Sequence, residues 1–195
     1  MSDDTKTIVL CGVGGQGALL AADLLARCAA ASGDDVKLSE IHGMAQRGGA
    51  VTTVVRIGSN VSSMVADLGC ADFLLAFETT EALRGLPFLK AEGRAIVSDE
   101  SIKPLPVLTG SASMPKQARA RLKDSGAIVL PAELLAKQAG TAKAVNVVLL
   151  GALSVYLTYE DAIWRKTIES RVPAKFLDAN LAAFELGRKA VVSVG

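Results

Sequence analysis

The sequence predicts a single three-layer α/β domain of the Rossmann-like kind, in which helices cover both faces of a mostly parallel sheet. The chain has 195 residues, of which half are hydrophobic and only 4% aromatic, and this suffices for one such core. Short β-branched runs alternate with stretches rich in alanine and leucine, as expected of strands that alternate with helices. A glycine-rich segment directly follows the first of these runs, where such folds turn from strand to helix.

The strands are predicted from short apolar runs that turn residues separate. They are expected over residues 7–11, 36–39, 51–57, 73–77, 95–98 and 127–130. Residues 61–65 follow the turn signal Gly58-Ser-Asn60 and are expected to return as a hairpin arm.

The helices are predicted from composition and from their end signals, and the first is rich in alanine and leucine and has no glycine or proline. They are expected over residues 18–32, 79–83, 116–123, 132–139, 145–157, 161–169 and 174–192. Gly33 is a typical end for the first helix, and Thr79 or Thr80 is expected to cap the second. The helix over 145–157 is mainly apolar and is expected to be buried, with Asn146 as a cap or as a hydrogen-bonding group inside the core.

The first glycine loop, Gly12-Val-Gly-Gly-Gln-Gly17, has the spacing G-x-G-x-x-G between a strand and a helix. Glycines at this spacing let the backbone approach a ligand, and the free N–H groups of a helix N-terminus attract anions. Glu40 follows at about the separation of a carboxylate that binds a ribose. This pattern is typical of dinucleotide-binding domains.

The chain after Glu40 departs from that pattern. A loop of about ten residues leads straight to the next strand, whereas a parallel crossover requires a dozen or more. The second and third strands are therefore predicted to be antiparallel neighbours. Three interpretations of the first glycine loop stay open: close packing of strand on helix, contact with a cofactor or other anion, and contact with a partner subunit.

The second glycine loop runs from Glu40 to Gly49 and reads Glu-Ile-His-Gly-Met-Ala-Gln-Arg-Gly-Gly. Together with the first loop and with Val55-Arg56, it resembles the gamma module of the 2-oxoacid:ferredoxin oxidoreductases. The sequence of this second loop is similar in particular to that of the small, or beta, subunit of the indolepyruvate branch. The resemblance covers nearly the whole chain and continues through Phe77-Glu78, Asn146, Leu150-Gly-Ala152, Arg171-Val-Pro-Ala-Lys-Phe and Phe184-Glu-Leu-Gly187.

The resemblance implies a subunit of an enzyme that oxidises a 2-oxoacid with coenzyme A and passes two electrons to ferredoxin. It implies a large partner subunit that holds thiamine diphosphate, magnesium and iron–sulfur clusters. No cofactor or metal is expected on this chain alone, and the chain alone is expected to be inactive. Contact with coenzyme A is left open, as is a homodimer of the isolated chain. The alternatives to this interpretation are an NAD(P)- or flavin-dependent oxidoreductase and a subunit that only stabilises its partner.

Four side chains of the second loop are candidates for the chemistry. The guanidinium of Arg47 could bind the oxoacid carboxylate, a phosphate of coenzyme A or a carboxylate of the partner, or it could tie the loop to Glu40. His42 could exchange protons near neutral pH, and Gln46 could donate to an oxyanion. Glu40 could orient Arg47 or His42. The residues expected to face a cofactor are Gly12, Gly14, Gly15, Gln16, Gly17, Gly48 and Gly49.

Composition bears on the class of partner. The net charge of +1 gives no electrostatic reason to expect nucleic acid or an acidic membrane as a partner.

The polar start and the lack of a long apolar run favour a cytoplasmic protein. Cys11, Cys28 and Cys70 have no C-x-x-C spacing, which argues against a zinc site, a disulfide framework or a four-cysteine cluster.

Overall fold

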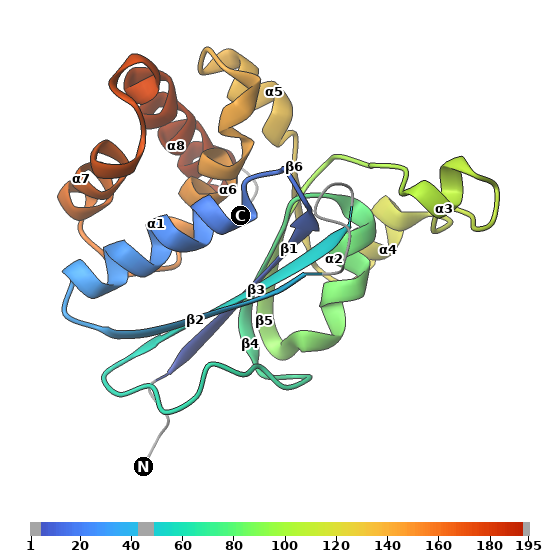
Figure 1. Cartoon of the computed structure of the whole chain (residues 1–195), viewed down its shortest axis with the longest axis horizontal. Helices are drawn as coiled ribbons and strands as arrows, with labels where there is room; N and C mark the ends of the chain where they lie inside the picture. The colour runs from blue at the N-terminus through green and yellow to red at the C-terminus, as the bar shows by residue number, and fades with distance from the viewer. Residues whose placement is uncertain (1–4, 43–48, 193–195) are drawn as a thin grey trace.

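Six strands form one sheet in the order β2–β3–β1–β4–β5–β6, as the computed structural model of the chain shows (Figure 1). The structure describes residues 5–42 and 49–192. The strands are β1 (Lys6–Val13), β2 (Asp35–His42), β3 (Ala50–Gly58), β4 (Ala71–Ala76), β5 (Leu89–Ser98) and β6 (Ile128–Leu130). Only β3 runs against its neighbours, β2 and β1, whereas β1, β4, β5 and β6 are parallel. The predicted mostly parallel sheet and the antiparallel pairing of the second and third strands are both confirmed.

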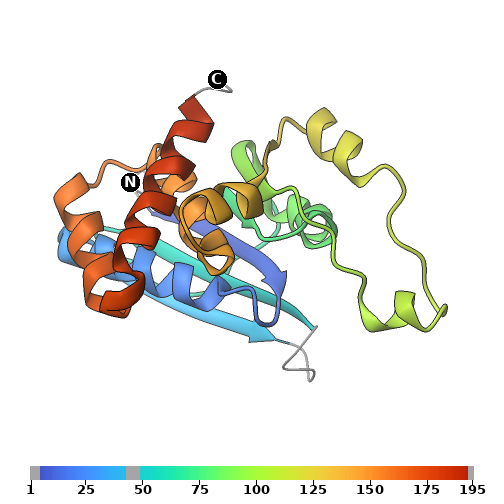
Figure 2. The ribbon, with the colours of Figure 1, turned by 90° about the horizontal axis from the view of Figure 1, so that it is seen from above.

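Helices cover both faces of the sheet, as predicted (Figures 1 and 2). One face carries α1, α5, α6, α7 and α8, and the other carries α2 and α4. Their bounds are α1 (Ala18–Ala31), α2 (Thr79–Gly85), α3 (Leu105–Leu108), α4 (Ala118–Asp124), α5 (Ala132–Gln138), α6 (Val145–Ser154), α7 (Asp161–Arg171) and α8 (Leu177–Val192). Three short 3-10 turns, Leu86–Phe88, Ala142–Ala144 and Ala174–Phe176, precede β5, α6 and α8.

The alternation of side chains along β1 divides the core into two clusters. Ile8 and Leu10 are fully buried in the cluster that includes α1, α6 and α8. Val9 and Cys11 point the other way, into the smaller cluster under α2 and α4. A strand buried on both faces carries a continuous apolar run, which is why residues 7–11 could be recognised as a central strand.

Helices α6 and α8 pack closely enough that no side chain fits between them at two glycines. A Cβ on Gly151 would lie 2.1 Å from the carbonyl oxygen of Phe184, and one on Gly187 would lie 1.9 Å from that of Val148. Residues 146–154 of α6 are all buried, as the apolar sequence predicted. The two glycines therefore serve helix packing within this chain.

Residues 61–65 form no strand, so the predicted hairpin arm is wrong. Val61 is buried, and its backbone N–H donates to Oδ2 of Asp35 over 2.8 Å rather than to a neighbouring strand. The guanidinium of Arg56 donates to the carbonyl oxygen of Ser63 over 3.2 Å. Side chains of β2 and β3 thus hold this segment, and its own backbone forms no β-ladder with another strand.

The predicted cap of α2, Thr79 or Thr80, is also wrong. Glu78 is the N-cap, and its buried carboxylate accepts hydrogen bonds from the backbone N–H groups of Thr80 and Glu81. Thr79 and Thr80, the expected caps, lie inside the helix. A glutamate can take this position because its longer side chain folds back to the first turn. The short helix α3 was not predicted.

Candidate functional site at two joined glycine loops

The two glycine loops meet at the edge of the sheet where β1 ends. The backbone N–H of Gly14 donates to the carbonyl oxygen of Gly49 over 2.9 Å. The antiparallel pairing of β1 with β3 brings this about, because it sets Val13 opposite Ala50 and so places the two loops next to each other. The first loop and the described end of the second loop therefore contribute to one surface.

Gln16 fastens the first loop to the ends of two strands. Its Oε1 accepts from the backbone N–H of Val13 over 2.7 Å, and its Nε2 donates to the carbonyl oxygen of Phe77 over 3.1 Å. Gly12 leaves room for this arrangement, since a Cβ there would lie 2.9 Å from Oε1 of Gln16 and 3.0 Å from Cβ of Phe77. The amide expected to face a cofactor thus forms hydrogen bonds within the chain.

Gly17 is the N-cap of α1 and has a left-handed backbone, with φ of +81°. Asn146 at the start of α6 donates from Nδ2 to the carbonyl oxygen of Gly17 over 3.3 Å. A Cβ on Gly17 would lie 2.7 Å from that same nitrogen. Asn146 is 5% exposed and therefore belongs to the buried support of the loop, as the prediction of a hydrogen-bonding group inside the core allowed.

These contacts bear on the dinucleotide interpretation. Side chains of this chain occupy the space that a Cβ on Gly12 or Gly17 would need. The N–H of Gly14 already donates to the carbonyl oxygen of Gly49. A backbone that cradles a pyrophosphate needs such groups free. Gly15 has φ of +104° and nothing within 4 Å of where a Cβ would be, so it faces open space. The loop therefore fits a docking surface better than a dinucleotide cradle.

Glu40 lies on β2 directly opposite Thr53 of β3. Oε2 of Glu40 and Oγ1 of Thr53 are both buried, and neither has a hydrogen-bond partner in the part of the chain that the structure describes. A buried carboxylate oxygen without a donor is costly, so this location favours the arrival of a donor from elsewhere. Sequence reasoning singled out Glu40 but missed Thr53, whose only signal is its position opposite Glu40 in the ladder.

The other candidates of the second loop lie at or beyond its described boundary. The backbone of His42 ends β2 and pairs with Val51. Gln46, Arg47 and Gly48 lie outside the described residues.

The cysteines offer no nucleophile or cluster ligand near this edge. Burial raises the pKa of the Cys11 thiol to about 12, a hydrogen bond with Thr52 opposes the rise, and the charge of Glu81 adds to it. Burial also raises the pKa of Cys28 to about 12. No group of three His, Cys, Asp or Glu side chains gathers into a metal site within the ranges described above. A cluster therefore does not fit the described part of this chain.

The acidic groups beside β4 are arranged around the start of α2. Burial raises the pKa of Glu81, Arg84 opposes this, and the nearby carboxylate of Glu78 adds to it. The carboxylate of Glu78 is used as the helix cap, where backbone N–H groups stabilise negative charge. The carboxylate of Glu81 lies in the first turn and pairs with Arg84 over 3.5 Å, so both groups have structural partners within α2.

Comparison with known proteins decides the family. The family profile described as pyruvate ferredoxin/flavodoxin oxidoreductase matches residues 7–190. The chain belongs to the pyruvate ferredoxin/flavodoxin oxidoreductase family. Two relatives of this family named indolepyruvate oxidoreductase subunit IorB come from Thermococcus kodakarensis and Pyrococcus horikoshii. They are 41% and 39% identical to this chain, and in each case the match covers 94% of both chains.

A solved oxidoreductase structure agrees with this family assignment. The gamma subunit of a keto/oxoacid ferredoxin oxidoreductase from Geobacter sulfurreducens is 26% identical and superposes with a TM-score of 0.71. The match covers 96% of this chain and 99% of that one. The resemblance found in the sequence is thereby confirmed over the length of the chain. Among the described helices of this family member, none is long and apolar enough to span a bilayer.

Proposed function

We propose that this chain is the small subunit of a thiamine-diphosphate-dependent 2-oxoacid:ferredoxin oxidoreductase that acts on indolepyruvate and related aryl-pyruvates. In the complete enzyme, the 2-oxoacid loses carbon dioxide and its acyl group joins the sulfur of coenzyme A. Two electrons and a proton leave, and the electrons pass to two ferredoxins. We assign thiamine diphosphate, magnesium and the iron–sulfur clusters to a large partner subunit, and the family match and the subunit names of the relatives support a partner.

One observation carries the proposal: the hydrogen bond of 2.9 Å from the N–H of Gly14 to the carbonyl oxygen of Gly49. It fixes the end of the second glycine loop against the first, which Gln16 and Asn146 in turn anchor to the core. A loop fixed at its root can present side chains to a neighbouring active site with little loss of conformational entropy. This arrangement suits a subunit that completes a site held by another chain.

Arg47 is the residue of the second loop to which we assign contact with the reacting molecules. A guanidinium binds a carboxylate with two parallel hydrogen bonds, and every 2-oxoacid carries a carboxylate. Glu40 is a positioning residue for Arg47, since its Oε2 is buried without a donor among the described residues. Gln46 and His42 supply further donors from the same loop.

Reconstitution with the co-expressed large subunit tests these roles. The Arg47→Ala variant is expected to form the complex but to lower kcat/KM for indolepyruvate by about 100-fold, as loss of one charged contact to a reacting group does. Arg47→Lys should recover only part of this loss, because an ammonium cannot form the paired hydrogen bonds.

Glu40→Gln gives the second arm of the experiment. If Glu40 acts through Arg47, the double variant Glu40→Gln/Arg47→Ala loses no more activity than Arg47→Ala alone. Full turnover of the Arg47→Ala complex would contradict the proposed role of the loop. A purified chain that binds NAD or NADP at micromolar concentration would favour the nicotinamide alternative instead.

A further inference from the structure

The connection from β5 to α4 leaves the body of the fold and reaches away from the sheet (Figures 1 and 2). We name residues 101–123 the basic arm; it contains α3 and most of α4. The arm carries five of the chain's 21 Lys and Arg residues and none of its 20 Asp and Glu residues. Sixteen basic and twenty acidic residues remain elsewhere, so an arm of charge +5 belongs to a body of charge −4.

The five cations of the basic arm are all exposed, and they are Lys103, Lys116, Arg119, Arg121 and Lys123. Arg119 is paired with Asp99 at the end of β5. No ion pair is recorded for the other four with any residue that the structure describes. Four like charges without local counter-ions indicate a surface that is complementary to an acidic one.

Apolar groups lie between these charges. Leu108 beside the tip of the arm is 66% exposed. A hollow of about 400 Å³ separates the arm from α2 and is lined by Leu83, Val107 and Met114, with Arg84 and Arg121 among its other residues. A second hollow of about 640 Å³ shares Met114 and includes Lys103 and Arg119. Apolar hollows with cations beside them suit a protein segment that carries both apolar and acidic side chains.

The observations favour a protein over the other polyanions. The arm has no aromatic side chain on which a nucleic-acid base could stack. A connection of this length without a covering element is uncommon inside a compact domain unless it has a binding role. Ferredoxin is a poorer choice, because an electron carrier docks beside the clusters and the described part of this chain has no cluster ligands.

We infer that the basic arm is a docking surface for an acidic, partly apolar face of the large subunit. This inference rests on the proposed function, since that function supplies the large subunit. The arm lies apart from the joined glycine loops, so it adds a second point of attachment (Figure 2). Two separated contacts hold a loop over a neighbouring site more firmly than one.

The test measures the affinity of this chain for the immobilised large subunit at about 50 mM and about 300 mM salt. The double variant Lys116→Glu/Arg121→Glu is expected to bind about tenfold more weakly at low salt and to lose most of the salt dependence. The matched control Lys6→Glu/Lys166→Glu reverses two exposed charges elsewhere and should change affinity less than about twofold.

A second pair of variants tests the apolar part. Leu108→Asp should weaken binding by about fivefold or more, because it places a charge in the apolar contact. Leu134→Asp is the control, since Leu134 on α5 is 65% exposed and thus matches Leu108. Circular dichroism melting of each free variant confirms that it is folded.

Three results would overturn the inference. Arm variants that bind the large subunit as tightly as the wild-type chain would contradict it while leaving the proposed function intact. Arm variants that assemble normally but lose affinity for coenzyme A or for an RNA oligonucleotide would assign the arm to a different anion. A wild-type chain that does not bind the large subunit would contradict the proposed function itself, and the inference with it.

Discussion

Nδ2 of Asn146 donates to the carbonyl oxygen of Gly17, although 129 residues separate the two in sequence. The bond joins the start of α6 to the N-terminus of α1 and so anchors the first glycine loop to the largest part of the core. The second loop is attached to the first through Gly14 and Gly49. The geometry of the candidate site therefore depends on a helix from the far half of the chain.

The Gly17→Ala variant tests this anchor. Its φ of +81° disfavours a residue with a Cβ, and that Cβ would lie 2.7 Å from Nδ2 of Asn146. We expect a loss of about 2–4 kcal/mol in the free energy of unfolding, of which about 1–2 kcal/mol is the backbone cost alone. Gly33→Ala is the control, because Gly33 has φ of +97° but nothing within 4 Å. Equal losses for both variants in urea denaturation would contradict the role of Asn146.

The contact between α6 and α8 predicts that replacing a glycine there changes the stability of the chain in the opposite direction to that expected from helix propensity. Replacing a glycine inside a helix by alanine usually stabilises it by about 1 kcal/mol. Gly187→Ala should instead destabilise the chain by about 3 kcal/mol or more, because its Cβ would lie 1.9 Å from the carbonyl oxygen of Val148. Ala182→Gly at an exposed position of α8 measures propensity alone and should cost about 1 kcal/mol. Thermal unfolding of the two variants decides between packing and propensity.

The sequence predicted the sheet and most helices because their signals are local. Central strands buried on both faces read as continuous apolar runs, and the helix breaks fall at glycine and proline. Three features were missed, namely the conformation of residues 61–65, the cap of α2 and the short helix α3. Residues 61–65 have strand-like composition, but Arg56 and Asp35 use their side chains to hold that segment in another conformation. The cap of α2 was missed because Glu78 takes a position where shorter side chains are usual.

The meeting of the two glycine loops was predictable, since loops after neighbouring strand ends lie at one edge of a sheet. The partners of the loop side chains were not. Gln16 and Asn146 donate to main-chain carbonyl oxygens of Phe77 and Gly17, and such acceptors exist at every residue, so the sequence carries no signal for them. The same holds for Gly151 and Gly187, whose partners are also backbone atoms. Motifs that identify the family thus serve internal packing as well as function.

Thiol reactivity separates the three cysteines. Burial raises the pKa of Cys11 and of Cys28 to about 12, and the thiolate is the reactive form. Cys70 is half-buried and free. We expect one thiol per chain to react readily with a disulfide reagent in the native protein at pH 8, and all three in denaturant. Cys70→Ser should abolish the native reaction, and a second readily reacting thiol in that variant would contradict the burial of Cys11 and Cys28.

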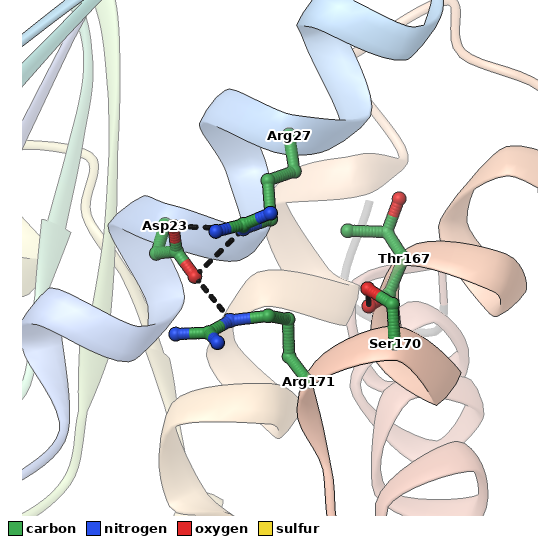
Figure 3. A network of polar contacts seen from close by, with 5 residues as sticks. All are labelled: Asp23, Arg27, Thr167, Ser170 and Arg171. Atoms are coloured by element: carbon green, nitrogen blue, oxygen red, sulfur yellow. Dashed lines mark hydrogen bonds and ion pairs between the residues drawn. The ribbon is translucent and has the colours of Figure 1, made fainter.

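The carboxylate of Asp23 on α1 lies between the guanidinium groups of Arg27 and Arg171, at 2.9 Å and 2.7 Å (Figure 3). Burial alone would raise its pKa, but hydrogen bonds from both arginines outweigh this and lower the pKa below its usual range. A lowered pKa contributes stability above the unfolded value of about 4, and this contribution is lost as pH falls through the folded value. Asp23→Asn should therefore cost about 0.5–1 kcal/mol at pH 7 and nothing at a pH below the folded value. The control Asp67→Asn alters an exposed carboxylate that forms no ion pair among the described residues, and it should cost nothing at either pH. A loss of stability in Asp23→Asn that is the same at both pH values would contradict the ion-pair explanation.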